Sequence, residues 1–255
     1  MTVRAISYGG GVQSTALLVL AARGEIDYPL AIFANTGDDS EHPDSLRYVR
    51  EVAAPYADQH GIKLVEVAHK TETLYQKTLR QKGITIPMRL PSGAPAARGC
   101  TRDFKVQPIA AEIKRRGATK TDKATLALGI SLDEWHRMKD STISWEEFIF
   151  PLIDLRMDRA ACEVLVADAG IPIPAKSACW FCPYTSPARW KDRLRNEPGI
   201  FSRAVQFERD VNARMDFPVY LTDRAKPLDL AITDDGQMDM FRDDATCDIG
   251  GYCFA

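Results

Sequence analysis

The chain has 255 residues, of which 45% are hydrophobic and 27% are charged, and these values are ordinary for a globular protein with a full-sized core. Its formal net charge of −2 gives no general attraction to nucleic acid or to an anionic membrane. No apolar run approaches the roughly 20 residues that span a bilayer, and the first apolar stretch begins too early to follow a signal peptide. We therefore expect a cytoplasmic protein, in which six cysteines indicate metal or redox chemistry rather than disulfides.

The first part of the chain alternates between strand-like and helix-like patterns. Apolar runs predict strands, and apolar residues at helical spacing predict helices, in this order: strand 3–8, helix 12–22, strand 29–34, a helix from residue 43, strand 62–67. This alternation is typical of an α/β fold with a doubly wound, mainly parallel sheet. Because such sheets bind ligands beyond the carboxyl ends of their strands, we expect Gly9–Gly11 and Asn35–Gly37 to lie at the site.

A glycine-rich turn joins the first strand to the first helix, with the sequence Ser7-Tyr8-Gly9-Gly10-Gly11-Val12-Gln13-Ser14-Thr15. Glycine permits positive φ and a close approach of a ligand to the backbone. The N–H groups at the start of a helix favour an anion, and the hydroxyls of Ser14 and Thr15 add donors. The turn therefore predicts a phosphate site, with tight packing as the alternative. Neither the GxGxxG nor the GxxxxGK[ST] pattern is present.

The alternation of helix-like and strand-like stretches continues along the chain and ends in its last third. We expect a helix at 71–83, a Pro- and Gly-rich loop at 84–99, a helix at 104–116, a strand at 124–130, a short apolar run at 148–153 and a helix at 158–169. The loop is interpreted as a lid over the ligand. After two prolines, short motifs and one helix near 201–214 follow. We expect a nucleotide-binding domain at 1–175 and a small cysteine-containing region at 176–255 packed on it.

The pair Cys179-Trp180-Phe181-Cys182 is a C-x-x-C motif, which alone is compatible with a redox dithiol, half a zinc site or half an iron–sulfur site. Its late position, between two prolines, differs from that of a thioredoxin motif. Cys247 and Cys253 near the C-terminus could complete a Cys₄ zinc site. Cys162 falls inside a predicted amphipathic helix and is expected to be a core residue.

The glycine-rich turn resembles the PP-loop of ATP pyrophosphatases, which usually reads SGGxDS. Gly9, Gly10, Gly11, Val12, Gln13 and Ser14 follow that pattern with two departures. Gly9 stands where the family usually has serine, and Gln13 stands where it has aspartate. Since Gln13 is neutral, it does not supply a carboxylate that could hold Mg²⁺.

The order of motifs resembles the PAPS-reductase-like branch of this family, which includes sulfonucleotide reductases and the ATP pyrophosphatases of DNA phosphorothioation; more distant relatives thiolate tRNA. The motifs are the glycine turn, Asn35-Thr36-Gly37, the segment 100–108 from Cys100 to Pro108, Gly129-Ile130-Ser131-Leu132-Asp133-Glu134, Pro151-Leu152-Ile153-Asp154 and Cys179-x-x-Cys182-Pro183. Together they cover most of residues 1–215.

The resemblance implies a role for each matching residue. Nucleotide phosphates would be held by Ser7, Gly9, Gly10, Gly11, Gln13 and Ser14. Asn35 and Thr36 would lie near the adenosine, and Gly129 and Ile130 would line the adenine pocket. Arg102, Lys105 and Arg137 would contact phosphates or the second substrate.

The resemblance also implies that Cys100, Cys179 and Cys182 ligate a [4Fe–4S] cluster, with zinc or free thiols as the alternatives. Cluster-containing sulfonucleotide reductases often have two adjacent cysteines at the first position, whereas this chain has Gly99-Cys100. Either Cys247 or Cys253 supplies the fourth ligand, or one iron stays open to bind a substrate sulfide. We assign Cys247 as a metal ligand and Cys253 as a catalytic sulfur carrier.

Three functions follow as hypotheses. The first is an enzyme that uses ATP, with Mg²⁺, to adenylate an acceptor and then installs sulfur. Its expected partners are an adenine nucleotide, a nucleic-acid acceptor and a sulfur donor such as a cysteine desulfurase, with a homodimer as an open possibility. The second is a PAPS or APS reductase, although the tail lacks the Glu-Cys-Gly-x-His motif that such an enzyme usually uses. The third is a nucleotide-binding module without catalysis in a modification or defence complex.

Several other residues allow two interpretations. Asp133, Glu134 and His136 are candidate acid–base groups or a solvated helix start. A Mg²⁺ site and a helix N-terminus are both compatible with the group Asp38, Asp39, Glu41 and His42. The basic segment Arg189–Arg195, which contains Trp190, could grip a polynucleotide and stack a base, or form a surface helix with Trp190 and Leu194 packed inward.

Overall fold

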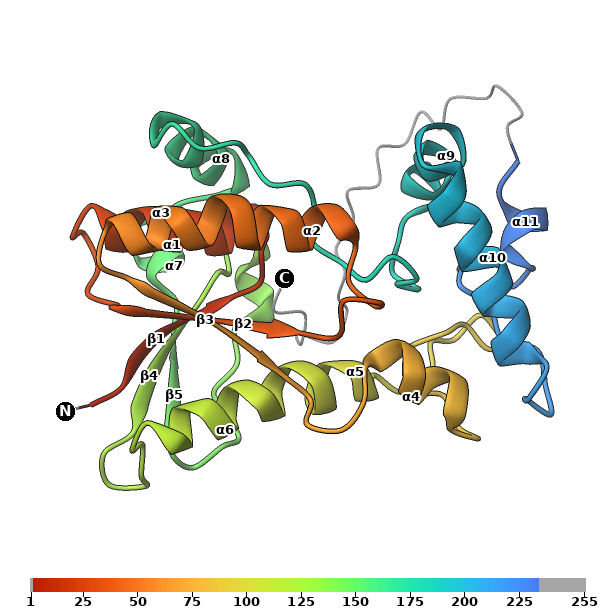
Figure 1. Ribbon diagram of the computed structural model, residues 1–255, viewed down its shortest axis with the longest axis horizontal. Coiled ribbons are helices and arrows are strands. Elements are labelled where there is room, and N and C mark those ends of the chain that lie inside the picture. Colours follow the sequence, from red (N-terminus) through yellow and green to blue (C-terminus); the bar gives the residue numbers. More distant parts are fainter. Residues whose placement is uncertain (1, 234–255) are drawn as a thin grey trace. The chain divides into compact units, whose positions relative to one another are not determined.

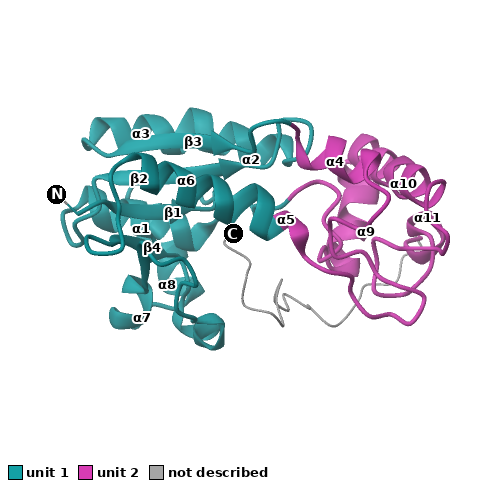
Figure 2. Ribbon diagram, turned by 90° about the horizontal axis from the view of Figure 1, so that it is seen from below, with its two compact units in different colours: residues 1–71, 101–178, 250–255 teal, residues 72–100, 179–249 magenta. Residues whose placement is uncertain are grey.

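The computed structural model describes residues 2–233, and their contacts divide the chain into two compact units (Figure 2). The first unit contains residues 2–71 and 101–178, and the second contains 72–100 and 179–233. The expected boundary after residue 175 lies near the junction at 178/179. Residues 72–100, which the sequence analysis assigned to the first domain, group with the second unit. Cys247 and Cys253 lie outside the described residues.

The first unit is built on a five-stranded parallel sheet. Its strands are β1 (Arg4–Tyr8), β2 (Leu30–Asn35), β3 (Lys63–Ala68), β4 (Ala124–Leu128) and β5 (Glu146–Ile149). They are ordered β3-β2-β1-β4-β5, and Ile6 of β1 pairs with Ala31 of β2 and Ala127 of β4. The chain moves outward from β1 on one side and then on the other, so the topology reverses at β1. This confirms the predicted doubly wound α/β fold.

Helices cover both faces of this sheet (Figure 1). One face carries α1 (Val12–Ala22), α2 (Pro43–Arg47), η1 (Tyr48–Ala53), α3 (Ala54–Gln59), α7 (Pro151–Asp154) and α8 (Arg159–Asp168). The other face carries α6 (Gln107–Arg115). Leu17, Phe33 and Val166 belong to the first apolar core, and Ile32 and Ile113 to the second. Both faces of the central strands β1, β2 and β4 are buried, which explains their continuous apolar runs.

Two elements differ from the predicted ones, the helix expected at 104–116 and the apolar run expected at 148–153. Helical backbone begins at α5 (Gly99–Thr101), continues through η2 (Arg102–Val106) with π-helical hydrogen bonds, and only then becomes the regular helix α6. Pro108, which has no backbone N–H, lies just where the π-helical segment passes into α6. The short run predicted at 148–153 divides into β5 and α7, because Pro151 begins a helix.

The second unit is helical. It contains α4 (Leu74–Arg80), α9 (Pro187–Asn196), α10 (Pro198–Asn212) and α11 (Leu228–Ala231). Thr73 and Gln76 form a capping box at the start of α4, and Ser186 caps α9. In the core of this unit, the rings of Phe181 and Phe207 lie 4.4 Å apart between centroids.

Hydrogen bonds from backbone and side-chain groups hold the loops of the second unit in place. The loop containing Arg89 pairs with Tyr220 through two backbone hydrogen bonds of 2.8 and 2.9 Å. Glu208 of α10 accepts hydrogen bonds from the backbone N–H groups of Leu221 and Leu228 at 2.6 and 2.7 Å. Burial raises the pKa of Glu208 to about 7.

Among the described helices, none has the length and apolar character that a membrane span requires.

Candidate functional site

The glycine-rich turn lies at the carboxyl end of β1, where the strand order reverses. Gly10 has φ of +75°, a conformation that L side chains rarely adopt. A Cβ added there would lie 3.3 Å from Cγ2 of Val49 and 3.4 Å from Oγ of Ser177. Backbone conformation and crowding therefore both favour glycine at this position.

The hydroxyls of the turn hold its own backbone. Ser14 Oγ donates to the carbonyl of Gly11 at 3.0 Å and lies 3.2 Å from the Gly11 nitrogen, which donates to it. Thr15 Oγ1 donates to the same carbonyl at 2.9 Å and lies 3.1 Å from the hydroxyl of Tyr8. Burial raises the pKa of Tyr8, so this phenol stays protonated. The structure thus assigns the hydroxyls of Ser14 and Thr15 a role in shaping the turn.

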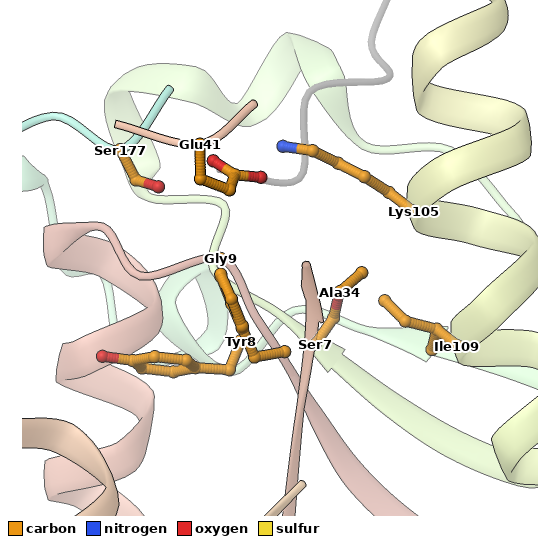
Figure 3. Close-up of a pocket in the computed structure, with 9 residues that line it drawn as sticks. Ser7, Tyr8, Gly9, Ala34, Glu41, Lys105, Ile109 and Ser177 are labelled. Carbon is orange, nitrogen blue, oxygen red and sulfur yellow. The ribbon is translucent and has the colours of Figure 1, made fainter. Parts of the chain in front are cut away.

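A small pocket opens beside the turn and brings together residues from several segments of the first unit (Figure 3). Its lining residues are Ser7, Tyr8, Gly9, Phe33, Ala34, Glu41, Lys105, Ile109 and Ser177. Figure 3 shows the Lys105 side chain extending across the opening so that Nζ approaches the carboxylate of Glu41. Of the residues predicted to hold phosphate, Ser7, Gly9 and Lys105 therefore line one cavity. The pocket thus places the ammonium of Lys105 and the carboxylate of Glu41 beside the glycine-rich turn.

Gly129 follows β4 and lies against the start of α1. A Cβ at this position would be 2.8 Å from the Ser14 nitrogen and 3.0 Å from the Gln13 carbonyl carbon. Both are backbone atoms, so they cannot yield as a flexible side chain would. Gln13 links the same two segments, because its Nε2 lies 3.4 Å from Oγ of Ser131 and 3.4 Å from Oε2 of Glu134. Close packing of this segment thus fixes the geometry of the turn.

Asn35, at the carboxyl end of β2, belongs to a polar network. Its Nδ2 donates to Asp38 and Glu66, each at 2.7 Å, while its Oδ1 accepts from the Gly37 nitrogen at 2.8 Å. Arg50 pairs with both carboxylates at 2.7 and 2.8 Å. The Arg50 and Asn35 hydrogen bonds lower the pKa of Asp38, and they lower that of Glu66 against the opposing effect of burial. This network orients Asn35, whose predicted contact with adenosine stays a prediction.

Thr36 is held by Glu41. The Thr36 hydroxyl and backbone nitrogen donate to Oε1 of Glu41 at 2.8 and 3.3 Å, and Glu41 is 2% exposed. His42 Nδ1 accepts from the Asp44 nitrogen at 3.3 Å and so caps α2. Of the four candidate Mg²⁺ ligands, Glu41 is the one that lines the pocket.

The other predicted site residues of the first unit have different surroundings. Arg102 is exposed and pairs with its neighbour Asp103 at 2.7 Å. Arg137 is buried and pairs with Glu134 at 2.6 Å. Ile130 belongs to the apolar core beside α6. Asp133 accepts from the backbone nitrogen of Arg159 at 3.0 Å, at the start of α8, which favours its interpretation as a helix-start residue.

The C-x-x-C turn belongs to the second unit and is anchored by its two middle residues. Trp180 and Phe181 are fully buried, and their rings pack on Phe207. The nitrogen of Cys182 donates to the carbonyl of Cys179 at 3.1 Å, which closes the turn. Both cysteines are half-buried. Burial of the aromatic pair therefore holds the two thiols on a fixed turn.

Arg193 of α9 contacts this turn. Its Nη1 donates to the carbonyl of Trp180 at 2.7 Å, and the side chain is 1% exposed. Burial, and then the nearby charge of Arg189, lower the pKa of Arg193 to about 10. Nearby Glu197, Cys182 and Cys179 act in the opposite direction. A buried cation thus lies within electrostatic reach of both thiols.

The second unit contains three cysteines whose thiolates are candidate metal ligands. Cys100, Cys179 and Cys182 all belong to this unit, and Cys100 is also half-buried, with its backbone nitrogen bound to the carbonyl of Thr85 at 3.0 Å. Within residues 2–233, however, no three His, Cys, Asp or Glu side chains form a group that could hold a metal ion. Cys162 is a core residue as expected, and burial raises its pKa to about 12.

The basic segment 189–195 forms part of α9. Trp190 is fully buried and its ring lies 6.2 Å from that of Phe201, so it offers no face for base stacking. The inward-packed helix is the correct interpretation for this residue. A different aromatic lies among bases, since the guanidinium groups of Arg89 and Arg98 are 5.6 and 5.0 Å from the ring centroid of Tyr184.

Sequence reasoning missed two kinds of site residue. Ser177 lines the pocket from a segment far along the chain, and no motif marks it. Arg193 was seen only as one base in a charged segment. The spacing of Trp190 and Arg193, three residues apart on one helix, could have indicated that this arginine shares the buried face.

Comparison with known proteins gives limited information. No family model matches the chain, and no curated protein matches it. Among solved structures it is similar to the U34-tRNA thiolase NcsA from Methanococcus maripaludis with its [4Fe-4S] cluster. The TM-score is 0.43 and the identity is 16%, over 82% of this chain and 71% of that chain. A similarity at this level assigns neither an activity nor a cofactor to this chain.

Proposed function

We propose that this chain is a PP-loop enzyme that uses ATP to adenylate an acceptor oxygen, releases pyrophosphate, and then replaces the activated oxygen with sulfur. The observation that carries the proposal is the pocket at the carboxyl end of β1, in which the glycine turn, Lys105 and Glu41 converge. The order of sequence motifs from the glycine turn to Cys182 supports the same reading.

The chemistry of the first step follows from these residues. The acceptor oxygen attacks the α-phosphorus of ATP, the bond to the bridging oxygen breaks, and pyrophosphate leaves. Backbone N–H groups of Gly9 and Gly10 and the ammonium of Lys105 would stabilise the negative charge that develops on the leaving group. Glu41 would orient Lys105 or take part in holding Mg²⁺. A sulfur nucleophile then displaces AMP from the adenylated acceptor.

The sulfur step is assigned to the cysteines. Cys100, Cys179 and Cys182 would hold a [4Fe–4S] cluster, with a fourth ligand from Cys247 or an open iron, and Cys253 would carry sulfur as a persulfide. The outer sulfur of the persulfide would displace AMP and leave a mixed disulfide between the acceptor and Cys253. A second cysteine thiol would then attack the Cys253 sulfur, which releases the thiolated product and leaves the two cysteines as a disulfide. Such a cluster, when bound, supplies either electron transfer or a Lewis-acidic iron. Zinc is the alternative metal, since cysteine thiolates also bind it.

The test of the adenylation step is acceptor-dependent pyrophosphate release. The full chain is incubated with ATP and Mg²⁺, alone and with tRNA or DNA, and pyrophosphate and AMP are measured. We expect both products in equal amounts and only with an acceptor. Sulfite released from PAPS or APS would support a sulfonucleotide reductase instead, and ATP binding without any product would support a non-catalytic binding module.

Metal content tests the cysteine assignment separately. Protein purified without oxygen should contain about four irons and four acid-labile sulfides per chain, as a [4Fe–4S] cluster requires. Cys100→Ala should lose most of this iron, whereas Cys162→Ala should keep it because the Cys162 side chain is buried in the apolar core. One zinc and no sulfide would contradict the cluster.

A further inference from the structure

Arg193 is a buried cation with unused hydrogen-bonding capacity. The side chain is 1% exposed, and one of its nitrogens binds the Trp180 carbonyl. Its Nε and Nη2 are also buried, and neither has a hydrogen-bond partner within residues 2–233. The described part of the chain gives Arg193 no ion pair either. A desolvated charge in this state is costly unless an anion lies close to it.

Arg193 contacts the C-x-x-C turn, and no ion pair joins it to Glu197 among the described residues, so the sulfurs of this turn are candidates to meet this need. Arg193 donates to the carbonyl between the two cysteines, so its guanidinium lies at the turn itself. Glu197 first, and then Cys182 and Cys179, oppose the lowering of the Arg193 pKa by burial. The contact of Arg193 with the ring of Trp190, at 5.0 Å, offers only a weak substitute for an anion.

We propose that Arg193 is the counter-cation of an anionic sulfur site at Cys179 and Cys182, where it holds thiolate sulfur on the turn, either bare or bound to a metal. Arg193 is then a positioning residue, because it acts through the cysteines. This inference deepens the sulfur-handling part of the proposed function and rests on it for the role of the two cysteines.

Alkylation with two reagents of different charge tests the proposal. Iodoacetate is an anion and iodoacetamide is neutral, and the thiolate attacks the carbon of either reagent and displaces iodide, so the rate with iodoacetate divided by the rate with iodoacetamide does not depend on how much thiolate is present. The ratio instead reports the local electrostatic potential. The rates are measured on the full chain, by mass spectrometry of the peptide that carries Cys179 and Cys182. Arg193→Met should lower the ratio of the iodoacetate rate to the iodoacetamide rate about fivefold, which is the effect of one nearby charge in a partly solvated site.

Two variants separate charge from packing. Arg193→Lys keeps the charge and should keep the ratio close to that of the wild type. Arg195→Met removes a charge from an exposed position of the same helix and should also leave it unchanged. An unchanged ratio in Arg193→Met would overturn the proposal, as would an equal loss in Arg193→Lys.

Two further measurements test the proposal if Arg193→Met fails to fold or if a bound metal blocks alkylation. In the wild type, the native ratio should exceed the ratio in urea by the same factor, and equal ratios would again overturn the proposal. If iron protects the thiols, Arg193→Met should make the reduction potential of the cluster more negative, and no change would overturn it. Neither reagent needs ATP or an acceptor, so failure of the adenylation step is observed separately through pyrophosphate release.

Discussion

Replacing Lys105 by methionine should slow acceptor-dependent pyrophosphate release by about a hundredfold or more, the usual effect of removing one preorganised charge-stabilising group. The lysine stem packs along the pocket wall and its ammonium reaches across the opening toward Glu41 (Figure 3). Methionine keeps the apolar stem and removes the charge. The free energy of unfolding, measured in urea, should therefore change little.

The matched control for this variant is Lys123→Met. Lys123 is exposed and precedes β4, at the amino end of the sheet and away from the glycine turn. The same change of charge there should leave the rate of pyrophosphate release within about twofold of the wild type, since an exposed distant charge is screened. Equal rates in Lys105→Met and Lys123→Met would show that the pocket does not stabilise the departing pyrophosphate.

A methyl group at Gly129 should weaken ATP binding by at least about tenfold. The Cβ of Gly129→Ala would overlap the backbone of Gln13 and Ser14, so the start of α1 or the end of β4 must move. Overpacking of this kind typically costs about 1–3 kcal/mol of stability. Calorimetric titration with ATP and thermal unfolding measure the two effects.

Gly199→Ala serves as the control for the Gly129 variant. A Cβ at Gly199 would meet no atom within 4 Å, and the residue lies in the first turn of α10. Alanine is favoured over glycine in a helix, so this variant should be as stable as the wild type or slightly more stable. If Gly129→Ala binds ATP as tightly as Gly199→Ala, the close packing around the turn does not govern nucleotide binding.

The fold of the first unit could be predicted because its signals are local. Apolar runs mark β1, β2 and β3, and the glycines of the turn mark the end of β1. The buried state of Cys162 also followed from the periodicity of its own helix. In each of these cases the residues that determine the structure are close to one another in the sequence.

The parts that could not be predicted depend on contacts between distant segments. The grouping of residues 72–100 with the second unit rests on pairs such as Arg89 with Tyr220. The hydroxyl of Ser14 donates to the carbonyl of Gly11 in the same turn, and its expected contact with phosphate stays a prediction. Arg193 looked like a surface base, and only the packing of α9 against Trp180 reveals that it is buried.

The π-helical segment η2 also affects how this chain should be aligned with others. A π turn holds one residue more than an α turn, so it counts as a one-residue insertion just before α6. Lys105 lies within this insertion, and removing one residue would rotate the preceding side chains by about 100° around the axis. A chain with a lysine three positions before the same proline but with an uninterrupted α-helix would therefore point that lysine elsewhere. An alignment that allows a gap at 102–106 is needed before this lysine is compared between proteins.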